Sequence, residues 1–210
     1  MTKSDAIEKI MKDYNGIVTL QIIYNNIEKY YPNAKKSDTW QAGIRGVLYR
    51  DIGKRFRKID VSTYALIDYD TLNLLPDNCR EGVLEKDLLV KVRTQQTLYR
   101  KRLLARLKYC PISGVTDKRL LVASHIKPWC LSSSEEKMDI YNGFILTPLY
   151  DKLFDSGLIT FTSKKEIVLS STLTHETITQ LGLRNCICEK LPIEGRERYL
   201  EFHNSEIFIK

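Results

Sequence analysis

Apolar residues in the first third of the chain recur at helical spacing in three places and alternate with polar residues in two others. In residues 4–13 they lie three and four positions apart, with Ser4 or Asp5 available as the N-cap and Gly16 beyond the end. We predict helices over 4–13, 20–30 and 39–51, a short extended piece at 17–18, and two strands joined by a tight turn over 55–60 and 62–67.

The order helix, helix, helix, hairpin resembles the winged helix-turn-helix modules appended to some restriction endonucleases. In such modules the third helix enters the major groove and the hairpin lies along the DNA backbone. Residues 1–70 are therefore expected to bind DNA, with a protein-binding or purely architectural winged helix as the alternative. The expected DNA contacts are Lys35, Lys36, Thr39, Gln41 and Arg45 at the third helix and Lys54, Arg55, Arg57 and Lys58 at the hairpin. Gln41 or Arg45 can read base edges, because each can make bidentate contacts.

The middle of the chain shows a break in periodicity followed by a long amphipathic stretch. Residues 71–83 have little periodicity, and we expect a linker there. Residues 84–108 predict a helix, broken or bent near Thr94, that opens a second domain over 84–210. The second half of this helix has leucines on one side and cations on the other, so its basic side can face the phosphates of a nucleic acid. The cations expected to do so are Arg100 and Arg102.

Positive charge is concentrated in two of these segments. Residues 31–58 hold eight Lys or Arg against two Asp, and residues 91–108 hold seven and no acidic residue, within a net charge of +7. A solvated surface usually mixes both signs, so this pattern favours faces that bind a polyanion such as nucleic acid.

Composition narrows the class of protein further. Residues 1–15 are charged throughout and lack the apolar core of a signal peptide, and no apolar run approaches the roughly 20 residues of a membrane helix. We expect a cytoplasmic protein with no membrane partner. The five cysteines are an odd number without a framework spacing, which favours free thiols. No Cys-x-x-Cys occurs, so we expect no structural zinc.

A block of about fifty residues carries the candidate chemistry. It reads Cys110-Pro-Ile-Ser-Gly114, then Ala123-Ser-His-Ile-Lys-Pro-Trp129, then Asn142-Gly-Phe-Ile-Leu-Thr-Pro-Leu-Tyr-Asp-Lys-Leu-Phe-Asp155. This pattern resembles the restriction-enzyme-like branch of the HNH endonuclease superfamily, whose module folds as two antiparallel strands followed by a helix around one metal. The implied architecture is α+β: an N-terminal winged helix-turn-helix domain plus a C-terminal ββα-metal (HNH) nuclease domain.

The polar residues of this block have distinct expected roles. Histidine titrates near neutrality and can take a proton from water, and by the resemblance His125 is the general base. Asn142 matches the family residue that ties down the loop between the strands, although Asn-Gly is also a common turn. Asp151 follows nine residues later, the interval the family uses for its metal ligand. Asp155 lies one helical turn further on the same face and either joins the metal site or caps the turn before Gly157.

Ser124 departs from the commoner family pattern. Many members carry a metal-binding Asp or His directly before the base, so either Ser124 binds weakly, His125 leans toward the metal, or Asp155 substitutes. The expected cofactor is Mg²⁺ or Mn²⁺, because the candidate ligands are oxygen atoms. Lys127 and Lys152 either offset charge on the phosphate or are simply solvated.

The C-terminal part of the chain is expected to contain a hairpin and a helix. Residues 158–170 predict a further hairpin, and 196–204 predict a C-terminal helix in which His203 packs or forms hydrogen bonds. We expect a site-specific, metal-dependent DNA endonuclease of the type II restriction kind that acts on double-stranded DNA as a homodimer. The alternatives are a nonspecific or nicking HNH nuclease, and a DNA-binding winged-helix regulator with a degenerate nuclease module.

Overall fold

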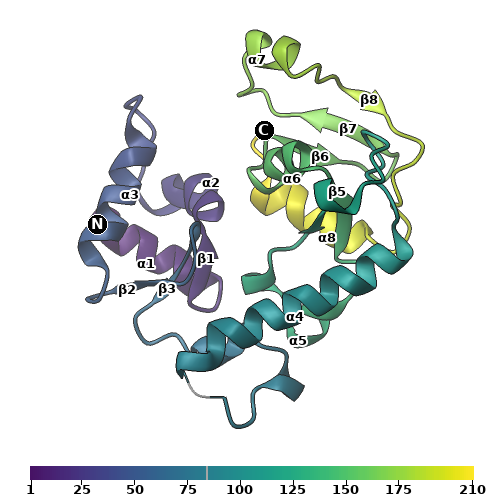
Figure 1. The fold of residues 1–210 in the computed structure, drawn as a ribbon. Coiled ribbons are helices and arrows are strands. Elements are labelled where there is room, and N and C mark those ends of the chain that lie inside the picture. The colour runs from purple at the N-terminus through teal and green to yellow at the C-terminus, as the bar shows by residue number, and fades with distance from the viewer. Residues whose placement is uncertain (84) are drawn as a thin grey trace. The chain divides into compact units, whose positions relative to one another are not determined.

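The computed structural model describes residues 1–83 and 85–210, and the chain divides into two compact units (Figure 1). Met1–Asp70 forms the first unit and Thr71–Lys210 the second. Helices and strands occur in both units, so the prediction of an α+β protein is confirmed.

The first unit contains three helices and a small antiparallel sheet in the predicted order. The elements are α1 (Lys3–Asp13), β1 (Ile17–Thr19), α2 (Leu20–Tyr30), α3 (Trp40–Asp51), β2 (Phe56–Lys58) and β3 (Thr63–Leu66). The strands lie in the order β1-β3-β2, with both pairings antiparallel. The apolar faces of the helices meet the sheet in a core whose fully buried members include Ile7, Ile10, Ile22, Ile27, Leu48 and Tyr64.

The N-cap predicted for the first helix is wrong. Thr2 caps α1 instead, because its hydroxyl accepts from the Asp5 amide (3.2 Å) while the Asp5 carboxylate accepts from the Thr2 amide (2.9 Å). Ser4 lies inside the first turn, and its hydroxyl donates to the Asp51 carboxylate (2.5 Å). The cap of α2 is Thr19, whose hydroxyl accepts from the Ile22 amide (3.4 Å).

The second unit begins with the segment that we expected to be a linker. Thr71–Leu74 forms a 3-10 turn, and Leu74 and Leu75 are buried. The Leu74 carbonyl accepts from the indole nitrogen of Trp129 (2.8 Å), and the Asn73 carbonyl accepts from the ammonium of Lys137 (2.9 Å). These bonds join the stretch to residues more than fifty positions away within the second unit.

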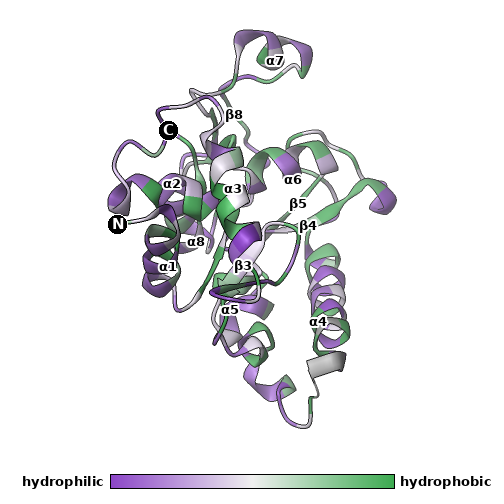
Figure 2. Cartoon of the chain, turned by 90° about the vertical axis from the view of Figure 1, so that its left-hand side faces the viewer, coloured by the Kyte–Doolittle hydropathy of each residue, from purple (hydrophilic) through white to green (hydrophobic). Residues whose placement is uncertain are grey.

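Helix α4 (Glu85–Arg106) follows, and its expected start at Leu84 lies outside the described residues. The predicted break near Thr94 is absent: the helix is continuous, and the Thr94 hydroxyl donates to the Val90 carbonyl one turn earlier (2.9 Å). Figure 2 shows hydrophobic and hydrophilic residues interspersed along α4. Tyr99 and Leu103 on its inner side are buried.

Two antiparallel strands pack next to α4, and a helix packs against these strands. These are β4 (Val122–His125), β5 (Gly143–Leu146) and α6 (Pro148–Asp155), with the short α5 (Ser134–Met138) in the loop between the strands. The register pairs Ser124 with Phe144 and His125 with Gly143. Pro148 occupies the first turn of α6, where its missing amide hydrogen costs no helical hydrogen bond.

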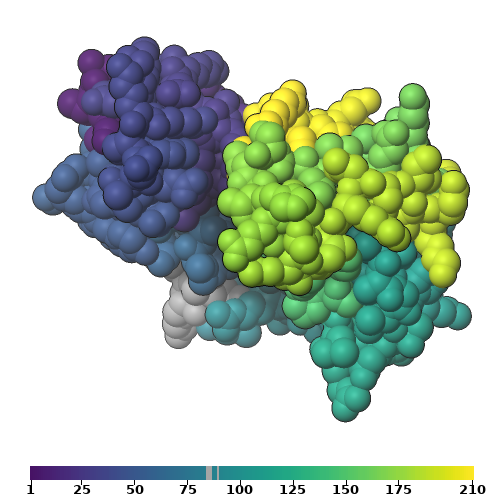
Figure 3. All heavy atoms as spheres, turned by 90° about the horizontal axis from the view of Figure 1, so that it is seen from above, coloured from purple at the N-terminus to yellow at the C-terminus, as the bar shows by residue number. Residues whose placement is uncertain are grey.

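A second sheet and the C-terminal helix complete the unit. The predicted hairpin is present as β6 (Ile159–Phe161) and β7 (Glu166–Leu169), and an unpredicted strand, β8 (Cys186–Ile187), pairs with β7. The segment with α7 (His175–Gln180) and β8 forms part of the surface (yellow-green in Figure 3). The C-terminal helix is α8 (Glu197–Phe202), which continues as a π-helical turn (His203–Ile207). No helix among the described residues is both long and apolar enough to cross a membrane.

Candidate active site

His125 ends β4 with its imidazole held in one orientation. Its Nε2 lies 3.2 Å from the carbonyl oxygen of Lys137. A carbonyl only accepts hydrogen bonds, so Nε2 carries the ring proton and Nδ1 keeps a free lone pair. Burial lowers the pKa of His125 to about 4, and the bond to the carbonyl opposes this only in part. The ring is therefore neutral near pH 7 and able to accept a proton at Nδ1.

Two aromatic side chains fix the plane of this imidazole. Tyr99 of α4 stacks on His125 with 3.9 Å between ring centroids and 23° between planes, and Trp129 meets it edge-on at 5.4 Å and 87°. The Tyr99 hydroxyl donates to the Asn142 carbonyl (3.0 Å), so α4 is tied to the start of β5. Sequence reasoning missed Tyr99, because an aromatic residue on the apolar side of a helix looks like any other core residue.

Gly143 is required by a close approach rather than by a turn. A Cβ at this position would collide with the Tyr99 hydroxyl and would lie 2.9 Å from the Ser124 carbonyl oxygen. Gly143 is also paired within β5. The alternative that Asn142-Gly143 is a simple turn is therefore wrong for Gly143, whose small size admits the tyrosine that stacks on His125.

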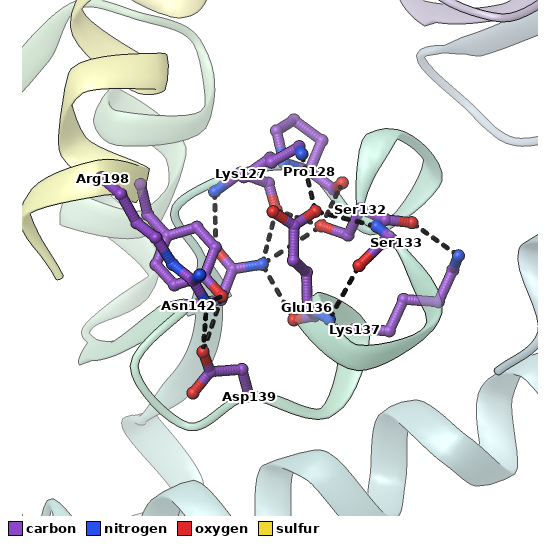
Figure 4. A network of polar contacts seen from close by, with 10 residues as sticks. Lys127, Pro128, Ser132, Ser133, Glu136, Lys137, Asp139, Asn142 and Arg198 are labelled. Carbon is purple, nitrogen blue, oxygen red and sulfur yellow. Dashed lines mark hydrogen bonds and ion pairs between the residues drawn. The ribbon is translucent and has the colours of Figure 1, made fainter. Parts of the chain in front are cut away.

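Asn142 joins the two ends of the loop between the strands. Its side-chain oxygen accepts from the Lys127 amide (2.8 Å), and its amide nitrogen lies 3.2 Å from the Lys127 carbonyl, 3.1 Å from the Ser132 hydroxyl and 3.1 Å from the Glu136 carbonyl. Figure 4 shows this amide pointing into the loop. Asn142 is fully buried, so each of these bonds replaces one to water. Because the loop also contains the Lys137 carbonyl, fixing it constrains His125.

Ser124, Asp151 and Asp155 bring their side-chain oxygens together. Asp151 and Asp155 lie one turn apart on α6, with Asp151 half-buried and Asp155 exposed. Surrounding protein raises the pKa of both carboxyls, and the neighbouring Asp151 charge further raises that of Asp155, to about 7.

The Ser124 hydroxyl completes this oxygen cluster. It is buried and has no aligned hydrogen-bond partner among the described residues, yet it lies near enough to lower the pKa of both Asp151 and Asp155. An unpaired buried hydroxyl beside two carboxylates that repel each other fits a divalent cation. The described residues contain no group of three or more His, Cys, Asp or Glu placed to hold a metal, and Mg²⁺ often takes only one or two protein carboxylates.

These contacts bear on the three alternatives for the metal site. Both Ser124 and Asp155 lie with Asp151, whereas the Nε2 of His125 is directed at a backbone carbonyl. The donor set that fits a metal is thus Asp151, Asp155 and Ser124. Lys152 is exposed on the same helix, and its positive charge lowers the pKa of both carboxyls.

Two of the cations expected to bind DNA are engaged within their own units. The guanidinium of Arg55 lies 2.9 Å from Asp5 and 2.5 Å from Glu8, which joins the start of β2 to α1. The ammonium of Lys127 lies 2.6 Å from Glu136. Both cations are therefore paired with carboxylates of their own units, and contact of either with DNA stays a prediction.

The other expected DNA contacts are distributed on exposed parts of each unit. Arg45 on α3 is half-buried and donates to the Tyr24 hydroxyl (3.0 Å), and Arg57 donates to the Ile67 carbonyl (2.9 Å). Arg100 on α4 donates to the Lys118 carbonyl (2.9 Å). The fully exposed residues are Lys35, Lys36, Thr39, Gln41, Lys54, Lys58 and Arg102.

Comparison with known proteins covers the part of the second unit that holds this site. Residues 110–162 match a family model described as HNH endonuclease. The match spans β4, β5 and α6, and with them His125, Asn142 and the three oxygen donors. No curated protein matches the chain.

Proposed function

Because residues 110–162 belong to the HNH endonuclease superfamily, we propose that this chain is a metal-dependent, site-specific DNA endonuclease of the restriction type. One observation carries the proposal: the neutral imidazole of His125 directly follows Ser124, whose unpaired hydroxyl lies beside Asp151 and Asp155. His125 ends β4 directly after Ser124, and we propose that the base and the oxygen cluster act on the same phosphodiester.

His125 acts as the general base. Its Nδ1 removes a proton from a water molecule while the water oxygen forms a bond to phosphorus. The bond from phosphorus to the 3′-oxygen then breaks, and this oxygen takes a proton from solvent water, which leaves a 3′-hydroxyl and a 5′-phosphate. The pKa of His125 is low in the free protein because of burial, and the negative charge of a bound phosphate raises it toward the value that a base needs.

Asp151, Asp155 and the Ser124 hydroxyl would hold the metal, for which we propose Mg²⁺ or Mn²⁺. When bound, the ion supplies positive charge that stabilises the charge developing on the phosphate and on the leaving oxygen. Its positive charge would also offset the repulsion between the two carboxylates. Lys152, exposed on the same helix, adds a positive charge on the side from which DNA would approach.

We propose that the first unit recognises DNA as a winged helix. The order α1-β1-α2-α3-β2-β3 and the sheet order β1-β3-β2 support this assignment. Gln41 is exposed on α3, where it can reach a base edge, and the exposed Lys54 and Lys58 flank the hairpin, where they can contact phosphates. Arg45 is held by Tyr24, which orients its guanidinium before DNA binds.

Plasmid cleavage tests the proposal. Purified protein with Mg²⁺ or Mn²⁺ should convert supercoiled DNA to discrete fragments, and chelation should stop the reaction. Because one module of this kind cuts one strand, a double-strand break requires two copies, and we propose a homodimer. Smears instead of fragments would show nonspecific cutting, accumulation of open circles would show nicking, and binding without cleavage under every metal would contradict the enzyme assignment.

His125→Ala should lower the cleavage rate at least about 100-fold while DNA binding is retained, since a general base contributes about 10²–10⁴. His175→Ala is the matched control, because His175 is exposed on α7. Equal rates for the His125 variant and the wild type would show that another group activates the water.

A further inference from the structure

Residues Thr71–Leu75 contact the loop between β4 and β5 at two points. The ammonium of Lys137 donates to the Asn73 carbonyl (2.9 Å), and the indole of Trp129 donates to the Leu74 carbonyl (2.8 Å). Both donors are buried, with 2% of Lys137 and 8% of Trp129 exposed. Buried N–H donors need acceptors, so these two bonds hold the segment and the loop together.

Both donors also contact His125. The backbone carbonyl of Lys137 accepts the Nε2 hydrogen bond of the imidazole, and the ring of Trp129 packs edge-on against it. The Lys137 ammonium reaches a further loop carbonyl, that of Ser132, at 2.7 Å (Figure 4). A single residue thus orients the carbonyl on His125 with its backbone and joins Asn73 to Ser132 with its side chain.

The burial of this ammonium is costly for stability. No carboxylate lies within 4 Å of its nitrogen among the described residues, and burial lowers the pKa of Lys137 to about 8. An apolar side chain of similar length would avoid this cost, because a charge held only by dipoles is poorly compensated. The lysine therefore contributes what an apolar residue cannot, which is two directed hydrogen bonds that fix the loop.

On the basis of the nuclease function proposed above, we propose that Lys137 and Trp129 are positioning residues of the active site. Together with Thr71–Leu75 they form a clasp that holds His125 as a single tautomer with Nδ1 available to the attacking water. The clasp acts through His125 alone, because both side chains are buried and bonded to backbone carbonyls, away from DNA.

The first test is ¹⁵N NMR of the histidine side chains in Lys137→Met, which keeps the length and removes the ammonium. In the wild type the two nitrogens of His125 should have separate shifts, with the proton on Nε2. In the variant these shifts should move toward each other, because the Lys137 carbonyl is free to turn and both tautomers are populated. His203 is the internal reference, since it donates to the Phe154 carbonyl (3.0 Å) elsewhere in the unit, and its signals should not change.

The second test is DNA cleavage. For Lys137→Met, kcat should fall at least tenfold while KM for DNA stays within twofold, because the lysine is buried. Lys164→Met, at an exposed position, should match the wild type in both experiments. Trp129→Phe keeps an aromatic ring and loses only the bond to Leu74, and it should shift the His125 nitrogens in the same direction with a smaller loss of kcat.

A single His125 tautomer and wild-type kcat in Lys137→Met would overturn the proposal. Loss of the His203 signals would show that Lys137→Met does not fold. In that case, a single His125 tautomer and wild-type kcat in Trp129→Phe would overturn the proposal. If the wild type cuts no DNA, the nuclease function fails instead, and the His125 shifts still decide whether the clasp exists.

Discussion

Replacing Asn142 with alanine should unfold the second unit at a markedly lower temperature. The wild-type side chain is fully buried. Its oxygen accepts one hydrogen bond, and its nitrogen donates to three nearby acceptors, all within the loop that fixes His125. Alanine removes the acceptor of the Lys127 amide, whereas the Lys127 and Glu136 carbonyls each keep one other donor, the Ser132 hydroxyl (3.1 Å) and the Asp139 amide (3.4 Å). The amide has two hydrogens and one acceptor oxygen, so about three bonds are lost, and at about 1 kcal/mol for each the free energy of unfolding should fall by about 3 kcal/mol.

This loss translates into a measurable shift. For a unit of roughly 140 residues, the unfolding entropy of about 2.1 cal/mol/K per residue gives a decrease in Tm of about 10 °C. The chain has two tryptophans, one in each unit, so a Trp40→Phe background leaves Trp129 as a fluorescent reporter of the second unit alone. Asn142→Ala and the exposed control Asn78→Ala would be compared in that background.

Asn142→Asp sharpens the test, because it keeps the volume and the oxygen that accepts from Lys127. Its second oxygen faces three acceptors, so the variant should be at least as destabilised as alanine near pH 7. Lowering the pH should recover part of the loss, since a protonated carboxyl can donate one bond. A Tm within 2 °C of wild type for Asn142→Ala would refute the reasoning that this residue holds the loop.

Two further predictions concern buried polar groups. Without metal, Ser124→Ala should be as stable as the wild type or up to about 2 kcal/mol more stable, because the variant lacks the unpaired buried hydroxyl. With Mg²⁺ added, the Tm of the variant should increase less than the Tm of the wild type. An equal increase in Tm would exclude Ser124 from the metal site. Burial lowers the pKa of His203 to about 4, so its contribution is complete above about pH 6.5 and decreases between about pH 6.5 and 4 at roughly 1.4 kcal/mol per pH unit. Between pH 7 and 5 the wild type should lose about 2 kcal/mol more than His203→Gln in denaturant titrations; parallel losses would contradict this assignment.

Local features of the fold could be predicted because their causes lie within a few residues. Thr19 caps α2 because its hydroxyl reaches an amide three residues later, and Asp151 and Asp155 share a face of α6 because they are four apart. The cap of α1 was misassigned for an equally local reason. Thr2 and Ser4 are both good capping residues, and only the chain direction before the helix shows which of them lies outside the first turn.

Features that depend on distant residues could not be predicted. In the sequence, nothing distinguishes Arg55 and Lys127 from the exposed lysines and arginines near them. Only packing brings Asp5 and Glu8 beside Arg55, and Glu136 beside Lys127. Tyr99 lies 26 positions before the histidine on which it stacks. A side chain cannot be assigned to a site from its own segment when its partner is set by how that segment packs.

The sequence by itself determined the helices of the first unit and the strand-strand-helix order of the second, and it singled out His125, Asp151 and Asp155 as candidates, because periodicity, capping and motif spacing act over short stretches of chain. The tertiary structure alone decided that Thr71–Leu75 belongs to the second unit and that Gly143 makes room for Tyr99. It also decided that the Lys137 carbonyl selects the tautomer of His125. Each of these depends on burial and on hydrogen bonds between residues far apart in the chain, and those exist only after the elements have packed.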